Sequence, residues 1–251
     1  MLHRVSPSIP LLRGRPRYGI LVSDLIQGVF PMRVAMLQME VVHDKQKNLS
    51  HAREHHIYLV GGSIPELEED RVYNTCFVFD REGRQIARHR KAHLFDIDVE
   101  GGQRFQESEV LSPGQRRTVF DTEFGTMGLC ICFDFRFQEL AKAMGDQGAQ
   151  LIVVPAAFNM TTGPAHWELM FRQRAVDNQL FTLGTAPARN EAEEYVSYGN
   201  SILVDPWGTV LARAGAGEEL LIADVDFARN QSIRQQLPIR AARRNDLYEA
   251  K

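Results

Sequence analysis

The residue in this sequence best placed to do chemistry is Cys132, which lies in the segment GLCICFDFRF of residues 128–137. The alternating, apolar run over 126–132 predicts a buried strand, and apolar side chains spaced three and four apart predict a helix over 137–144. Cys132 therefore falls where the strand ends, a position at which backbone N–H groups can point at an oxyanion. A thiol there can act as a nucleophile, although it can equally be a small buried side chain of the core.

A second polar stretch could supply charged groups to such a thiol. Residues 89–109 follow an expected strand and contain Lys91, which His89 and His93 flank, together with Glu107. Taken singly, each of these side chains is also of a kind that water usually solvates at a protein surface. The stretch is therefore a candidate for part of a site, and the residues alone leave both interpretations open.

The loop over residues 156–170 could line a pocket, because it runs from another expected strand into a helix. Its hydrogen-bonding side chains are Asn159, Thr161 and Thr162. The helix after it carries Arg174, which is either solvated or paired with nearby acids.

The elements that must position these groups alternate along the chain as strand, helix and strand. Many of the strands are short, rich in Val, Ile and Leu, and bounded by Gly, Pro or Asp, which is typical of strands buried on both faces. This pattern predicts a layered α/β domain with helices outside. Strands are expected at residues 33–39, 57–64, 75–80, 85–89, 126–132, 151–155, 181–186, 201–204, 210–212 and 220–225, and helices at 49–56, 137–144, 165–178 and 228–235.

The bulk composition excludes several classes of protein. A chain of 251 residues is long enough for one α/β domain with a sizeable core, or for two small domains. The formal charge of −3 argues against a nucleic-acid surface, and no apolar run is long enough to span a membrane. Three cysteines make no disulfide framework, so we expect a reducing, cytoplasmic compartment, and a C-x-C pair has too few ligands for a zinc site.

Residues 1–31 differ from the rest of the chain. They contain four arginines and a single acid, Asp24, together with several prolines and no clean hydrophobic period. We expect a disordered or non-native leader ahead of a domain that starts at Met32 and runs to residue 251. The same composition also fits a mitochondrial transit peptide, which is rich in arginine and poor in acids.

Five long motifs, taken in order, resemble the nitrilase (carbon–nitrogen hydrolase) superfamily, and within it most resemble the ω-amidase branch. The match covers essentially all of residues 32–248. The motifs are RKAHLFD from residue 90, RFQESEVLSPG from 104, GLCICFDFRFQEL from 128, PAAFNMTTGPAHWELMFRQRAVDNQ from 155 and SILVDPWGTVLARAG from 201.

The resemblance implies a fold and a reaction. The fold is an αββα four-layer sandwich that forms a homodimer through its helical layers, with no metal or organic cofactor. The reaction is amide cleavage by covalent catalysis, in which Cys132 attacks the amide carbon and a thioester is then hydrolysed. By motif, Lys91 and the backbone N–H of Phe133 stabilise the oxyanion, and Glu107 is the supporting carboxylate.

The resemblance also implies a small-molecule substrate, an ω-amide of a dicarboxylate such as 2-oxoglutaramate. Its free carboxylate would need a cation or backbone amides in the pocket. Arg136 and Arg174 are the candidate cations, although Arg136 could equally pair with an acid in the core. Asn159 and Thr161 are further candidates for the pocket wall.

The sequence departs from the family at one place. Arg53–His56 run directly into the strand at Ile57, where the family has a further helix, a strand ending in a Pro-Glu motif and a second helix, a difference of roughly 40 residues by the loop-length expectations of a βαβ unit. The glutamate of that motif is the general base, and no residue here matches it. We therefore expect a sandwich that lacks one central strand and its adjoining helices, with unpaired strand edges beside the gap.

The missing base leaves two further hypotheses beside a working amidase. The chain could be a catalytically impaired, truncated isoform or pseudoenzyme that keeps only the dimerising scaffold, or the gap could be an artefact of a mis-joined exon. Within an active chain, Glu66 or Glu107 could approach the vacated space as a stand-in base. A thiol–imidazole pair with His93 or His166 is a weaker alternative.

Overall fold

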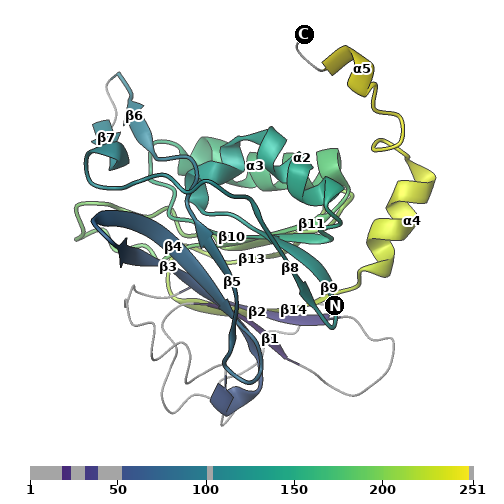
Figure 1. Cartoon of the computed structure of the whole chain (residues 1–251), viewed down its shortest axis with the longest axis horizontal. Coiled ribbons are helices and arrows are strands. Elements are labelled where there is room, and N and C mark those ends of the chain that lie inside the picture. Colours follow the sequence, from purple (N-terminus) through teal and green to yellow (C-terminus); the bar gives the residue numbers. More distant parts are fainter. Residues whose placement is uncertain (1–18, 24–31, 39–52, 101–103, 249–251) are drawn as a thin grey trace.

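The computed structural model describes residues 19–23, 32–38, 53–100 and 104–248, and two six-stranded sheets dominate it (Figure 1). The first sheet has the strand order β14-β2-β1-β3-β4-β5, and all its neighbouring strands pair antiparallel. Its strands are β1 Gly19–Ser23, β2 Met32–Gln38, β3 Tyr58–Glu68, β4 Arg71–Phe79, β5 Gln85–Arg90 and β14 Glu219–Val225.

The second sheet has the order β13-β12-β11-β10-β9-β8 and is parallel only across β9, β10 and β11. These three strands are linked by helices because parallel neighbours need a crossover connection. Its strands are β8 Thr118–Thr122, β9 Gly125–Leu129, β10 Leu151–Pro155, β11 Phe181–Thr185, β12 Ile202–Val204 and β13 Val210–Arg213.

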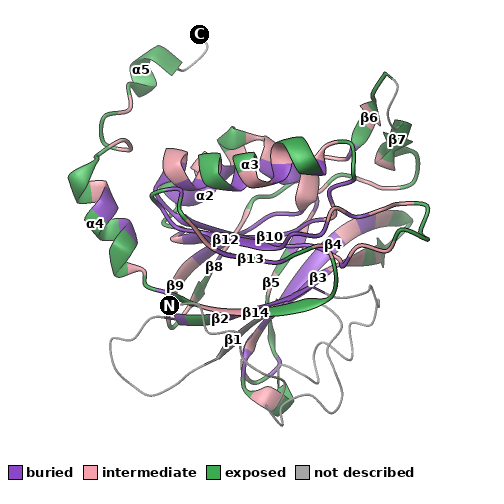
Figure 2. Cartoon of the chain, turned by 180° about the vertical axis from the view of Figure 1, so that it is seen from behind, coloured by how far each residue is buried: buried purple, intermediate pink, exposed green. Residues whose placement is uncertain are grey.

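The core lies in two layers, one between the sheets and one beneath the helices. Apolar side chains of both sheets meet face to face in the first layer, for example Val34 and Val78 with Leu129 and Val153. Helices α2 Gln138–Asp146 and α3 Gly163–Asn178 cover the other face of the second sheet and bury Trp167 against it. Figure 2 shows this arrangement, with the facing strands buried and the outward sides of the helices exposed.

The expected sandwich is confirmed in its two sheets and in the helical layer over the second sheet. Among the described residues, no helix as long as α2 or α3 lies on the outer face of the first sheet (Figure 1). Of the helix expected at 49–56, residues 53–55 form a single helical turn and residues 49–52 lie outside the described part of the chain. The junction at which the deletion is expected, between residues 53–56 and Ile57, leads directly into β3 of the first sheet.

Part of the segment expected to be a disordered or non-native leader is ordered, namely Gly19–Ser23. This segment forms β1 and pairs antiparallel with β2 on one side and with β3 on the other. The unpaired edges expected beside the gap are therefore absent there, because β1 bonds to both neighbouring strands. The rest of residues 1–31 lies outside the described part of the chain.

Most other expected elements are confirmed within one or two residues at each end. The strand expected over 57–64 continues to Glu68, and β4 begins at Arg71. The strand expected over 126–132 ends earlier, at Leu129, because the chain turns into a 3-10 helix at Cys132. No sequence pattern indicated β8 or the small hairpin of β6 Asp96–Asp98 and β7 Arg104–Gln106.

The C-terminal part of the described chain runs away from the sheets. Helix α4 Ala228–Gln236 was expected, whereas the short α5 Asn245–Tyr248 was not. Figure 1 shows both helices beside the sandwich, outside its layers. Within the described ranges, no helix combines the length and the apolar character needed to cross a membrane.

Candidate active site

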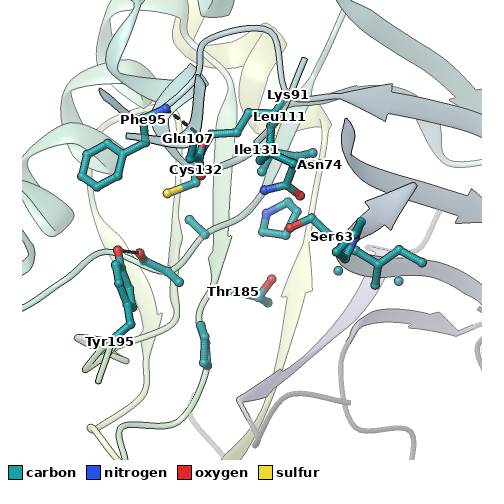
Figure 3. Close-up of a pocket in the computed structure, with 18 of the residues that line it drawn as sticks. Ser63, Asn74, Lys91, Phe95, Glu107, Leu111, Ile131, Cys132, Thr185 and Tyr195 are labelled. Carbon is teal, nitrogen blue, oxygen red and sulfur yellow. Dashed lines mark hydrogen bonds and ion pairs between the residues drawn. The ribbon is translucent and has the colours of Figure 1, made fainter. Parts of the chain in front are cut away.

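A cavity of about 530 Å³ opens where the ends of the two sheets meet (Figure 3). Lys91, Glu107 and Cys132, the three residues singled out as a catalytic set, all line it. They come from three different parts of the fold: Lys91 directly follows β5, Glu107 follows β7, and Cys132 follows β9. The remaining wall is formed by Gly61, Gly62, Ser63, Ile64, Pro65, Asn74, Phe95, Phe105, Leu111, Ile131, Pro155, Ala156, Ala157, Thr185, Pro187 and Tyr195.

Cys132 sits in a strained turn between a strand and a helix. Its φ angle of 47° lies in the left-handed region, which is uncommon for a residue other than glycine. The 3-10 helix Cys132–Arg136 begins at this residue and is followed by α2. Backbone strain of this kind clusters at functional sites, because the surrounding structure can hold a side chain there in one fixed orientation. The turn thus explains why the strand pattern stops short of the cysteine.

The thiol of Cys132 has a raised pKa. Burial is the largest influence and raises it, while the ammonium of Lys91 and the backbone N–H of Ala157 lower it and the carboxylate of Glu107 raises it. Lys91 therefore lowers the thiol pKa by its charge, but the effect of burial is larger. The resting cysteine is a neutral thiol, which must lose its proton as it becomes a nucleophile.

Lys91 and Glu107 form a tight ion pair inside the cavity. The Nζ atom of Lys91 lies 2.7 Å from each carboxylate oxygen of Glu107, and the Lys91 side chain is only 2% exposed. The second oxygen of Glu107 also accepts the backbone N–H of Phe95 at 2.9 Å. The backbone of Lys91 is fixed as well, since its N–H donates to the carbonyl of Asn74 and its own carbonyl accepts from Gly114. This carboxylate is thereby committed to orienting the ammonium.

The two candidate cations for a substrate carboxylate do not reach the cavity wall. Arg136 turns toward α3, where one guanidinium nitrogen lies 3.1 Å from Nδ1 of His166, and its charge stacks over the Phe158 ring. Burial lowers its pKa. Arg174 donates to the carbonyls of Phe135 and Arg136. Both arginines thus connect the turn after Cys132 to α3. The spacing of residues in the sequence does not reveal which way these two side chains point.

The other pocket candidates also serve the loop or the turn. The Asn159 side-chain oxygen accepts the backbone N–H and the hydroxyl of Thr162, so it shapes the loop before α3. Thr161 is exposed and lies outside the cavity lining. The ring of Phe133 packs between those of Phe95 and Phe137.

None of the proposed stand-in bases is both uncommitted and in the described cavity wall. Glu66 accepts hydrogen bonds from Thr75, Arg88 and Arg90, which hold its pKa low although burial raises it. The nitrogen Nδ1 of His93 lies 2.8 Å from a carboxylate oxygen of Asp134. Among the described residues that line the cavity, Glu107 supplies the carboxylate, and Lys91 already occupies both of its oxygens.

Several lining residues were missed by the sequence analysis. Gly61, Gly62 and Ser63 form an irregularity in the pairing of β3 with β4, and Gly62 has a φ of 68°. Two glycines inside a strand pattern signal such a bulge or a close approach, so this feature could have been found. Tyr195 donates its hydroxyl proton to the carbonyl of Ala157 at 2.6 Å, and no sequence signal marks it. Figure 3 shows Ser63 on the side of the cavity opposite Cys132.

The cavity wall holds a thiol, an ammonium paired with a carboxylate, and neutral polar groups. Within the part of the chain that the structure describes, no cluster of three or more His, Cys, Asp or Glu side chains could hold a metal ion. The arrangement is suited to attack on a carbonyl carbon, with the ammonium beside the developing negative charge.

Comparison with known proteins gives a consistent result. The family model for carbon–nitrogen hydrolases matches residues 45–235. The omega-amidase NIT2 of Xenopus tropicalis is 54% identical over 197 residues, which make up 78% of this chain and 71% of the relative. The crystal structure of Saccharomyces cerevisiae Nit3, a member of branch 10 of the nitrilase superfamily, has a TM-score of 0.73 and 41% identity, covering 83% of this chain and 74% of that one.

A second solved structure bears on the cysteine. It is a variant of the amidase from Nesterenkonia sp. AN1 that shows covalent addition of the acetamide moiety of fluoroacetamide at the active-site cysteine, with a TM-score of 0.62 and 26% identity over 78% of this chain and 72% of that one. The family match over most of the chain, the relatives and the shared fold agree with the cavity chemistry. The chain therefore belongs to the carbon–nitrogen hydrolase family, as an amidase-type hydrolase of the nitrilase superfamily most like the omega-amidases.

Proposed function

We propose that this chain cleaves the terminal amide of small dicarboxylate monoamides, of which 2-oxoglutaramate is an example, through a thioester on Cys132. The observation that carries the proposal is the meeting of Cys132, Lys91 and Glu107 around one cavity. The name of the omega-amidase relatives supports the substrate class.

In the proposed reaction the sulfur of Cys132 forms a bond to the amide carbon. The carbonyl oxygen becomes an oxyanion, which Lys91 and the backbone N–H of Phe133 stabilise by charge and hydrogen bonding. The carbon–nitrogen bond then breaks, and the thiol proton leaves with the amine as ammonia. Water attacks the resulting thioester, restoring the thiol and releasing the dicarboxylate. Because Glu107 neutralises Lys91 in the resting site, the ammonium is oriented before substrate arrives.

We propose that neutral donors at the far side of the cavity hold the free carboxylate of the substrate. Ser63 lies on that side in Figure 3 and Asn74 also lines the cavity, whereas neither Arg136 nor Arg174 is among the lining residues. Replacing Asn74 by Ala should raise KM for a dicarboxylate monoamide about tenfold and leave kcat nearly unchanged, because a lost ground-state contact affects binding. Butyramide, which has no carboxylate, supplies the matched substrate: its KM should not respond to the substitution.

The direct test of the proposed function is ammonia release from 2-oxoglutaramate by the purified chain, with Cys132→Ala as the control. We expect release that depends on Cys132 and that exceeds the rate with butyramide. Release from wild type at the same rate as from Cys132→Ala would refute amide hydrolysis by this chain.

One observation favours the second candidate, a catalytically impaired isoform that forms the thioester but hydrolyses it very slowly. Glu107 is the carboxylate that lines the cavity among the described residues. Both of its oxygens accept hydrogen bonds from Lys91, so it is badly placed to act as a general base. A chain without a general base would form the thioester slowly and hydrolyse it more slowly still, since such a base contributes about 10²–10⁴ in rate.

Mass spectrometry after incubation with substrate separates the two candidates. An impaired isoform should accumulate the acyl adduct on Cys132 with about one ammonia released per chain, whereas a competent amidase should show many turnovers. Unchanged amide hydrolysis in Glu107→Gln and in Glu66→Gln would exclude both residues as stand-in bases, because a base that carries the proton cannot be replaced by its amide. Sequencing the transcript across residues 53–57 tests whether the gap is encoded.

We also propose that the chain forms a homodimer through its helical layer. The outward side of α3 exposes Leu169, whose side chain is 61% accessible, as a dimer contact would require. Sedimentation velocity of wild type and Leu169→Glu tests this, with a shift from dimer to monomer expected in the variant.

A further inference from the structure

One buried carboxylate joins the two segments that bring the nucleophile and the cation together. Asp134 lies two residues after Cys132, and its side chain is completely inaccessible to solvent. Four of its five hydrogen bonds come from the segment that contains Lys91. The donors are the backbone N–H groups of Ala92 at 3.1 Å and His93 at 2.8 Å, Nδ1 of His93 at 2.8 Å, Nε2 of His89 at 2.9 Å, and the backbone N–H of Ile131 at 3.0 Å.

These bonds tie together elements of different sheets. His89 belongs to β5 of the first sheet, and Lys91 follows that strand. Ile131 lies just after β9 of the second sheet and directly precedes Cys132. Asp134 therefore fixes the residues on both sides of Lys91 to the residue before the nucleophile and to its own turn. We propose that Asp134 is a positioning residue that sets the place of Lys91 relative to the thiol of Cys132, with His89 and His93 as its side-chain donors.

The chemistry of the site requires a carboxylate. Each oxygen of Asp134 accepts both a backbone N–H and an imidazole N–H. All the polar groups that contact this carboxylate are therefore hydrogen-bond donors, and none of them could accept a hydrogen bond from residue 134. Burial raises the pKa of Asp134. The hydrogen bond and charge of His89, together with the hydrogen bonds from Ile131 and His93, lower it by more, so the net pKa is lowered. An asparagine has the same shape but would turn an NH2 group toward two N–H donors.

A contact between rings reinforces the same junction. The imidazole of His93 stacks on the ring of Phe137 with centroids 3.8 Å apart and planes at 15°. Phe137 directly follows the 3-10 helix that begins at Cys132. His93 thus meets the nucleophile turn both through Asp134 and through Phe137. This double attachment fits a junction that must be rigid, because a displacement of about 1 Å at a reacting group can lower a rate about 10²-fold.

The inference rests on Cys132 being the nucleophile of the proposed function, and its test does not need turnover. Fluoroacetamide alkylates a thiol as the sulfur bonds to the methylene carbon, fluoride leaves and the thiol proton is released. The rate of this reaction at Cys132, followed by peptide mass spectrometry, reports how well the thiol and Lys91 are placed. Cys76 and Cys130 are buried and their thiol pKa values are raised, so they serve as internal controls.

The variants to compare are Asp134→Asn and Asp205→Asn. Asp205 is an equally buried carboxylate that accepts the N–H groups of Trp207 and Thr209 and the Nε of Arg229, and it does not line the cavity. We expect Asp134→Asn to slow alkylation about 10²-fold per folded molecule and to lower kcat by a similar factor with KM within about twofold. Asp205→Asn should retain the wild-type rate. A folded Asp134→Asn that is alkylated at the wild-type rate would overturn the inference.

A second pair of variants decides the matter if Asp134→Asn does not fold. His93→Ala removes one of the five donors, whereas His93→Asn keeps an N–H near the position of Nδ1, and both lose the stacking on Phe137. We expect His93→Ala to slow alkylation about tenfold and His93→Asn to recover most of the rate. Equal rates in His93→Ala and wild type would overturn the inference. A wild-type thiol that fluoroacetamide leaves untouched would instead overturn the proposed nucleophile, and the inference with it.

Discussion

The two sheets contribute unlike things to the cavity. The second sheet, with α2 and α3 packed on its outer face, presents the thiol of Cys132 from a strained turn that arginines and a buried carboxylate hold in place. The first sheet presents the cation: Lys91 follows its edge strand β5, and the counter-charge of Lys91 comes from Glu107 after a separate small hairpin. The thiol of Cys132 is thus positioned by the layered core around the second sheet, and the ammonium of Lys91 by hydrogen bonds.

The largest expected effect concerns the core of the second sheet. Trp167 is fully buried between α3 and the sheet, contacts the rings of Phe158 and Phe171, and donates its indole N–H to the carbonyl of Asn200 at 2.7 Å. Trp167→Ala should lower the free energy of unfolding by about 3–5 kcal/mol. Urea titration followed by circular dichroism measures the loss. Trp207→Ala, at a side chain that is 55% exposed, is the control and should change stability by less than about 1 kcal/mol.

The next effect concerns the cation of the first sheet. Glu107→Gln removes the counter-charge of a nearly buried ammonium and leaves one acceptor where Lys91 now has two. We expect kcat/KM for amide hydrolysis to fall about 10²-fold, because a charge-assisted pair that orients Lys91 is lost. The exposed Glu109 lies two residues away, and Glu109→Gln should keep full activity. Equal losses in the two variants would mean that the ion pair does not matter.

The pH dependence of the alkylation of Cys132 tests the environment of this thiol in the cavity between the two sheets. Burial raises the pKa of Cys132 more than Lys91 and Ala157 lower it, so the thiolate is the minor form at neutral pH. The alkylation rate should therefore rise about tenfold per pH unit between pH 7 and 9 without levelling, because the thiolate is the reacting form. A free cysteine derivative, which levels off above its pKa of about 8.5, is the reference. A plateau near neutrality would contradict the raised pKa.

The smallest expected effect tests the pairing at the other side of the first sheet. Arg33 on β2 donates to Asp224 on β14 at 2.9 Å, with both side chains about half exposed. Arg33→Ala should lower the free energy of unfolding by less than about 1 kcal/mol, since solvent screens an exposed ion pair. Thermal unfolding at low and at high salt measures it, and the difference between wild type and variant should shrink at high salt. A loss comparable to that of Trp167→Ala would place this strand pair among the main determinants of stability.

Sequence patterns predicted most of the strands, the two main helices and the three residues that meet at the cavity. They did so because strand and helix periods are local, and because Cys132, Lys91 and Glu107 each lie in a long motif. The directions of Arg136 and Arg174 could not be predicted in this way. Both occur on segments next to the cavity, and only the packing of the 3-10 turn against α3 decides that they point toward carbonyls and rings.

The hydrogen bonds of Asp134 were equally hidden, because four of its five donor groups lie more than 40 residues away in the chain. The strand β1 was missed for a different reason. Five apolar or small residues among prolines and arginines carry too short a period to predict a strand, and their pairing depends on the space between β2 and β3.

The position of β1 has a consequence for how the N-terminal region can be processed. If an import peptidase removed residues 1–31 as a signal, it would also remove the strand that lies between β2 and β3. Two rows of backbone N–H and C=O groups would then open inside the sheet, which favours association with other chains. A mature form that begins at Met32 would therefore need another strand between β2 and β3. The stretch whose composition fits a cleavable transit peptide thus also supplies a strand of the first sheet.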